Sequence, residues 1–329
     1  MSLQSTLDQT LLDRLQQGWR LFTCPVWNHD THRLRAPLRA FLPLVMTFLA
    51  FGLVVTVVRP RFDHPVREFM EFSIMSVVLV AAVLASARLL DRRPVAEYGL
   101  TFNRKWARSF VVGGLVATVA NAGTMLVALA AGWATVSGFT QGSGALPFLP
   151  AMLLVLGYVG VLASWEEFMF RGAMLKNLAE GADGYLPRWG AVGLAVLLST
   201  AVFAFMHSGK VSDPMAYGYY VLAGLVFGGI YVLSGNLALP IGFHVFYNFT
   251  MSAVFGLGAS QQTPELIALT VVGPDFWIGE EGLARVIFAL VGGVLLVAYI
   301  RWRDGNLRIN DRVTWWTPIK TYDALDEEK

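Results

Sequence analysis

The sequence predicts an all-α polytopic membrane protein with about eight transmembrane helices around a buried polar site. Hydrophobic residues make up 55% of the 329 residues and charged residues only 15%, whereas a soluble domain has about 25% charged residues. Apolar runs of roughly 20 residues recur along the chain, which is the length that crosses a bilayer as a helix. A few ionisable groups stand inside these runs, and the most concentrated set is at residues 166–171.

Eight transmembrane spans are expected, with boundaries good to a few residues. They cover about 40–58, 69–88, 109–133, 146–166, 190–206, 215–234, 236–256 and 283–300. After the fourth span, the polar segment that contains Lys176 and Glu180 is expected to be a helix end followed by a loop.

The spans divide the chain into an N-terminal arm at 1–39, a transmembrane domain at 40–300 and a C-terminal tail at 301–329. Within the arm, helical spacing predicts an amphipathic helix with an apolar face formed by Leu3, Leu7, Leu11, Leu15 and Trp19. This helix is expected to lie either on the membrane surface or on the protein's own cytoplasmic face. The single cysteine, Cys24, cannot form an intrachain disulfide and is remote in sequence from the charged motif.

Basic residues predict the side of the membrane that each loop faces. Lys and Arg are frequent in the arm, the 88–108 loop and the tail, and are missing from the 134–145 and 257–282 loops. Both termini are therefore expected in the cytoplasm, which fits an even number of spans. The 59–68 loop, with three arginines, goes against this pattern. We expect an integral protein of a prokaryotic cell (inner) membrane.

The charged motif is the nonapeptide Ser-Trp-Glu-Glu-Phe-Met-Phe-Arg-Gly at residues 164–172. Residues 109–165 contain no Asp, Glu, Lys, Arg or His. Ionisable groups cost several kcal/mol at membrane depth, so they tend to mark function and to come with partners. Glu167 and Arg171 are four residues apart, in the order that favours an ion pair on a helix. Glu166 is not committed to that pair and is available for chemistry.

Two further polar sites follow at membrane depth. His207 ends the fifth span, and His244 and Asn248 lie four residues apart in the seventh, so both leave the same helix face. Singly, a histidine in a helix is usually a satisfied core residue, and Asn248 could be an interhelical hydrogen bond worth about 1 kcal/mol. Together with the glutamates, on three hydrophobic helices, these residues favour a polar reaction centre.

The three motifs resemble those of a known family. Glu-Glu-x-x-x-Arg at 166–171, Phe-x-x-x-His at 203–207 and His-x-x-x-Asn at 244–248 are similar, in that order, to the signature motifs of the CPBP family. This family is the CAAX-prenyl-protease and bacteriocin-processing group, also called the ABI family. The resemblance covers about 100–250 well and sets a core of about 100–256. It implies an intramembrane endopeptidase that cleaves a membrane-associated or prenylated substrate.

The resemblance also implies a role for each residue. Glu166 would be the general base that activates water, and His207 would share this water and pass a proton to the leaving amine. His244 and Asn248 would donate hydrogen bonds to the developing oxyanion, which contribute about 3–4 kcal/mol per donor. The supporting ion pair is Glu167 with Arg171.

The expected partners are a membrane-associated peptide or protein and the lipid bilayer. A net charge of +2 and the lack of a basic stripe with interleaved aromatic residues argue against a nucleic-acid partner. The oligomeric state is left open by the sequence.

Two alternatives remain open. Glu166, His207 and His244 make a three-ligand zinc site with an open position, although the His-Glu-x-x-His pattern is missing. A mechanism without a metal or other cofactor is preferred, because this is what the family resemblance implies.

The other alternative is a non-catalytic membrane protein, such as an immunity factor, a scaffold or a transporter subunit. A transporter would favour paired broken helices, and only Pro240 is a candidate break.

Overall fold

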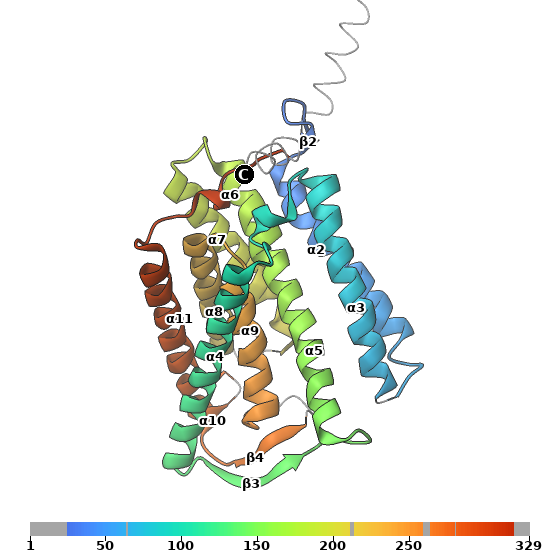
Figure 1. Ribbon diagram of the computed structural model, residues 1–329, viewed down its shortest axis with the longest axis vertical. Helices are drawn as coiled ribbons and strands as arrows, with labels where there is room; N and C mark the ends of the chain where they lie inside the picture. Colours follow the sequence, from blue (N-terminus) through green and yellow to red (C-terminus); the bar gives the residue numbers. More distant parts are fainter. Residues whose placement is uncertain (1–24, 64, 211–213, 259–263, 280, 319–329) are drawn as a thin grey trace, which may run out of the picture.

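The protein is a bundle of long helices, as the computed structural model of residues 25–63, 65–210, 214–258, 264–279 and 281–318 shows (Figure 1). The predicted all-α fold class is confirmed. The helices are α2 (Ala36–Val57), α3 (Val66–Ala85), α4 (Arg104–Ala130), α5 (Phe148–Glu167), α6 (Lys176–Ala182), α7 (Arg188–Met206), α8 (Pro214–Ser234), α9 (Ala238–Phe249), α10 (Asp275–Ile278) and α11 (Leu283–Asp304). The leucines of the predicted amphipathic arm lie outside the described residues.

Seven helical segments of the described chain are long and apolar enough to cross a membrane, so the chain is an integral membrane protein. Their ranges are 36–57, 66–90, 104–130, 148–182, 188–206, 216–234 and 275–304.

The seventh predicted span, 236–256, is not among these segments. It forms the 12-residue helix α9, which continues as a π-helix over Thr250–Val254. Most side chains of α9 are buried, and the helix packs against α4, α5 and α8. A helix that protein covers on all sides has the same apolar composition as one that faces lipid. Sequence composition alone therefore does not distinguish the buried helix α9 from a lipid-facing span.

The helix that carries Glu166 and Glu167 is longer than expected. Beyond α5 it continues without a break through the π-helix η3 (Phe168–Leu175) and α6, which gives one 35-residue helix from Phe148 to Ala182. The predicted loop around Lys176 and Glu180 is therefore wrong. Both side chains are buried on this helix, because partners from distant segments satisfy their charges.

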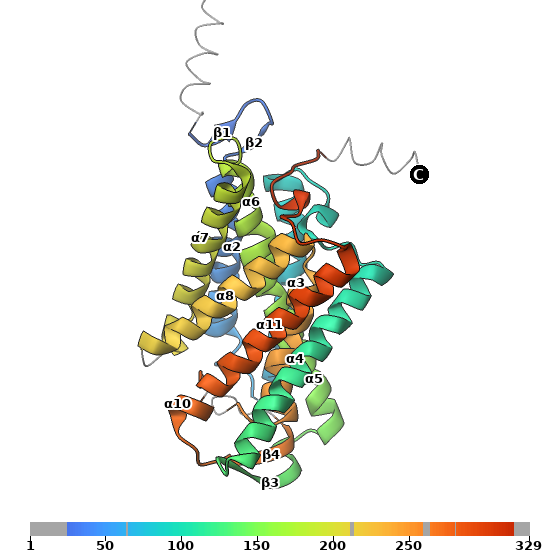
Figure 2. The ribbon, with the colours of Figure 1, turned by 90° about the vertical axis from the view of Figure 1, so that its left-hand side faces the viewer.

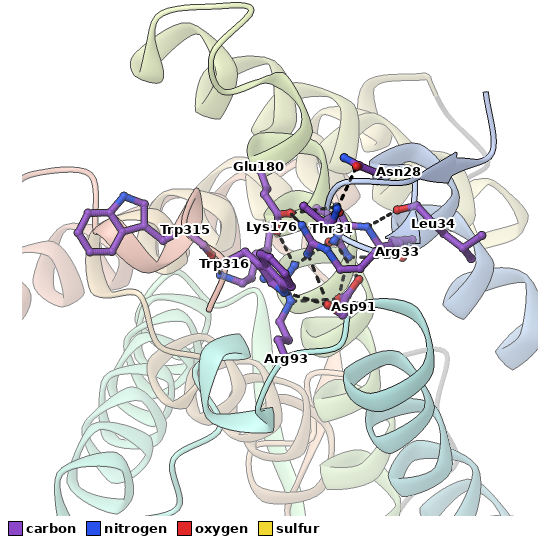
Figure 3. Close-up of polar contacts among 12 residues, drawn as sticks. Asn28, Thr31, Arg33, Leu34, Asp91, Arg93, Lys176, Glu180, Trp315 and Trp316 are labelled. Carbon is purple, nitrogen blue, oxygen red and sulfur yellow. Dashed lines mark hydrogen bonds and ion pairs between the residues drawn. The ribbon is translucent and has the colours of Figure 1, made fainter. Parts of the chain in front are cut away.

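A buried ion-pair network surrounds α6 (Figure 3). Glu180 Oε1 lies 2.8 Å from Arg33 Nη2 and 3.0 Å from Arg39 Nη2, and Glu180 Oε2 also pairs with Arg93. Asp91 accepts a hydrogen bond from Arg39 and another from the Tyr98 hydroxyl. Burial raises the pKa of Tyr98 well above its usual value, so the phenol stays protonated as a donor. The network joins α6 to the segments before α2 and after α3.

The C-terminal segment closes the same end of the bundle. The Lys176 ammonium donates to the carbonyl oxygen of Trp315, at 3.0 Å. The indole of Trp316 lies 3.6 Å from the Arg33 guanidinium and donates to the Asp91 carbonyl oxygen. Both ends of the described chain therefore contact the end of the 35-residue helix, as Figure 3 shows.

Two small antiparallel sheets lie at opposite ends of the bundle (Figure 1). The first pairs β1 (Trp27–Asn28) with β2 (Arg33–Leu34), and the second pairs β3 (Ala134–Gln141) with β4 (Glu265–Val271). The second sheet brings together the two loops that lack Lys and Arg.

The arginines of the exceptional 59–68 loop are partly neutralised. Arg59 Nε lies 2.9 Å from Glu71, and Arg67 Nη2 lies 2.7 Å from Glu68. Two of the three arginines that disagreed with the charge pattern are thus in ion pairs with acidic side chains.

Candidate active site

The structure brings the four candidate catalytic side chains to one cavity. Glu166 lies near the end of α5, His207 directly follows α7, and His244 and Asn248 lie on α9. All four line a cavity of about 110 Å³ whose other walls are mainly aromatic and aliphatic side chains of α8, α9 and α11. Segments about 80 residues apart in the sequence thus form a single polar pocket inside the helix bundle.

Glu166 faces both histidines. Its Oε2 atom lies 3.8 Å from His207 Nε2 and 3.9 Å from His244 Nε2. These distances exceed a direct hydrogen bond, and within the described chain Oε2 has no hydrogen-bond partner. The side chain as a whole is 22% exposed and lines the cavity, whereas its Oε2 atom is buried.

The ring orientation of His207 is fixed by two neighbours. Its Nδ1 atom lies 2.8 Å from the carbonyl oxygen of Phe203. Because a carbonyl oxygen only accepts, Nδ1 carries the hydrogen, and in the neutral ring Nε2 is the accepting nitrogen. The imidazole also stacks on Tyr220, with ring centroids 4.4 Å apart. His207 therefore directs its Nε2 atom at Glu166.

Glu167 has two partners rather than one. Its Oε1 atom lies 3.1 Å from Arg171 Nη1, as the spacing predicted, and 2.8 Å from His244 Nδ1. Glu167 is fully buried, and the Arg171 guanidinium also lies over the rings of Phe203 and Phe227. Because the carboxylate accepts from Nδ1–H, the Nε2 atom of His244 can donate to an oxyanion only when the ring is an imidazolium.

Asn248 occupies the cavity wall one turn beyond His244, on the same face of α9 as predicted. Its side chain is half-buried.

Asn121 was missed by the sequence reasoning. It is a fully buried amide of α4 that donates to the Tyr247 carbonyl oxygen at 2.7 Å and to Thr250 Oγ1 at 2.9 Å. Its position in the middle of an apolar span was a signal that could have revealed it.

The donor atoms suit zinc in type, but their spacing is wider than a shared ion requires. Ligands around tetrahedral zinc lie about 3.4 Å apart when the bonds are about 2.1 Å. The distances from Glu166 Oε2 to the two imidazole nitrogens are 3.8 and 3.9 Å. Within the described ranges, no group of three or more His, Cys, Asp or Glu side chains has the arrangement of a metal site.

Comparison with known families agrees with these motifs. Residues 146–250 match the family described as type II CAAX prenyl endopeptidase, Rce1-like. This region, about a third of the chain, is similar to the Rce1-like family. All three motifs fall inside the matched region, whereas α2, α3, α4 and α11 lie outside it. The Rce1-like match confirms the resemblance to CAAX proteases. No curated protein and no solved structure matches the chain.

Proposed function

We propose that the protein is an intramembrane endopeptidase that hydrolyses a peptide bond of a membrane-associated or prenylated substrate. The observation that carries this proposal is the position of Glu166. Its carboxylate faces two imidazoles inside a membrane bundle, and each imidazole is oriented by a partner of its own. The Rce1-like match adds that the matched family is one of endopeptidases.

The proposed nucleophile is a water molecule held by Glu166 and His207. Their facing atoms are 3.8 Å apart, so a water at about 2.8 Å from each would lie to the side of the line that joins them. Glu166 takes a proton from this water as the oxygen attacks the carbonyl carbon of the substrate. The proton then passes to the nitrogen of the breaking C–N bond, either from Glu166 or through His207.

The proposed oxyanion donors are His244 and Asn248. The amide of Asn248 donates directly, whereas His244 donates from Nε2 as an imidazolium whose charge Glu167 balances. Glu167 thus orients His244 in the way that the carboxylate of a hydrolase triad orients its histidine. Arg171 holds the Glu167 carboxylate in position through its ion pair. Each donor is expected to contribute about 3–4 kcal/mol to the transition state.

The test is Glu166→Gln in the full-length chain. The variant keeps the size of the side chain and removes the base, so proteolysis should fall at least about 100-fold, the lower end of general-base contributions. Substrates are found by comparing membrane-protein termini in cells that carry the wild type or the variant. Cleavage of a substrate at the wild-type rate by Glu166→Gln would contradict the proposal. Unchanged termini and phenotype would favour the non-catalytic alternative.

A further inference from the structure

An apolar groove lies on the surface of the bundle between α8 and α11, which run side by side in Figure 2. The groove has a volume of about 320 Å³, and all nine residues that line it are apolar. Val294 on its rim is 67% exposed. The groove therefore faces the hydrocarbon region of a membrane.

The groove is adjacent to the candidate active site. Val226 of α8 and Leu290 of α11 line both the groove and the cavity that holds Glu166 and the two histidines. These two side chains therefore lie between the cavity and the lipid-facing groove, which places the groove next to the reacting groups.

The length of the groove and the small residues at its base suit the binding of a helix. It extends from Leu225 to Leu233 along α8, which is about 12 Å, or two helical turns. Near its middle lie Gly229 and Gly293. A Cβ at Gly229 would meet no described atom within 4 Å, so the internal packing of the bundle does not require this glycine. In membranes, small residues let another helix approach closely.

We propose that this groove binds a transmembrane segment of a polypeptide substrate, beside the bond that is cut. The proposal rests on the proposed proteolysis and names its substrate class. The scissile peptide must reach Glu166, so the residues on one side of it leave the cavity between Val226 and Leu290. The apolar groove walls offer no side-chain hydrogen bonds, so a segment there must satisfy its own backbone, as a helix does.

The first test is a cross-link from the floor of the groove. Gly229→Cys is combined with Glu166→Gln and Cys24→Ser, and the new thiol is labelled with benzophenone maleimide in native membranes. After illumination, we expect adducts with transmembrane residues within a few helical turns of a cleavage site that Glu166→Gln abolishes. Gly193→Cys, on the exposed face of α7 where a Cβ also meets nothing, is the matched control. Adducts with lipid or an isoprenoid, or the same peptides from both positions, overturn the proposal.

The second test fills the groove. Gly229→Leu places a side chain in open space, so thermal unfolding should change little. Cleavage of the substrate found above should lose about 10-fold or more in kcat/KM, the scale of a disturbed apolar subsite, mainly through KM. Gly193→Leu should cleave normally. If Gly229→Leu cleaves at the wild-type rate while Glu166→Gln is inactive, the groove proposal is wrong and the proposed function stands. If Glu166→Gln also cleaves, the proposed function itself fails.

Discussion

Glu166 and Glu167 are neighbours in the chain with opposite surroundings. Glu166 is partly exposed to the cavity, whereas Glu167 is fully buried between Arg171 and His244. Breaking a buried pair leaves an uncompensated charge and costs about 3–5 kcal/mol. Glu167→Gln should therefore destabilise the protein by that amount in denaturant unfolding in mild detergent. Glu166→Gln should unfold like the wild type, and equal losses for the two variants would contradict the division of roles.

The same residues predict the response to metal removal. The wide spacing between Glu166 Oε2 and the two imidazole nitrogens favours catalysis without a shared ion. Purified active protein should keep its cleavage rate after exhaustive treatment with a chelator, and elemental analysis should show far less than one zinc per chain. A stoichiometric metal together with activity that is lost on chelation and restored by zinc would support the alternative, in which Glu166, His207 and His244 are ligands.

At the scale of elements, α9 is held by its close contact with α4. A Cβ at Gly242 would overlap the carbonyl oxygen of Phe110, and one at Gly113 would press on the carbonyl oxygen of Leu239. Both obstacles are backbone atoms, which cannot move without separating the helices. Gly242→Ala should therefore destabilise the protein by about 1–3 kcal/mol and lower cleavage, because α9 carries two candidate catalytic residues.

Gly160→Ala is the control for this prediction. Gly160 lies on α5, and a Cβ there would meet no described atom within 4 Å. This variant should be as stable as the wild type in the same unfolding measurement, since alanine is the better helix former. If both alanine variants unfold alike, the contact between α4 and α9 does not limit the stability of the bundle.

Most of the transmembrane helices were predictable from the sequence, but the continuation of α5 and the contacts between helices were not. The spans that became α2, α3, α4, α7, α8 and α11 were placed within a few residues, because lipid-facing helices are apolar over a fixed length. The continuation of α5 to Ala182 was not predictable, because charges such as Glu180 are satisfied by arginines up to about 150 residues away. The Glu167–Arg171 pair was predictable from helical spacing. The hydrogen bond from His244 to Glu167 was not, because it joins residues of two helices that are 77 positions apart in the sequence.

For the whole molecule, the path of the chain brings both described ends to the same end of the bundle. Although α9 is too short to count as a span, it begins near Gly99, on the terminal side of the bundle, and its π-helical extension ends against β4. In chain order, α9 and its extension follow α8 and lead from the terminal end of the bundle to the end that carries the β3–β4 sheet. The described ends of the chain consequently lie at one end, away from the β3–β4 sheet (Figure 1).

The charge distribution then predicts which end faces the cytoplasm. Loops at the terminal end carry most of the Lys and Arg, whereas the loops that form β3 and β4 carry none, and basic loops stay inside. In a Cys24→Ser background, a thiol at Ala145→Cys should react with a membrane-impermeant maleimide added to intact prokaryotic cells. A thiol at Asn306→Cys should react only after the membrane is opened, because both positions are exposed and only the bilayer distinguishes them. If Asn306→Cys reacts in intact cells and Ala145→Cys does not, the protein has the opposite orientation, with the terminal ion-pair network outside the cell.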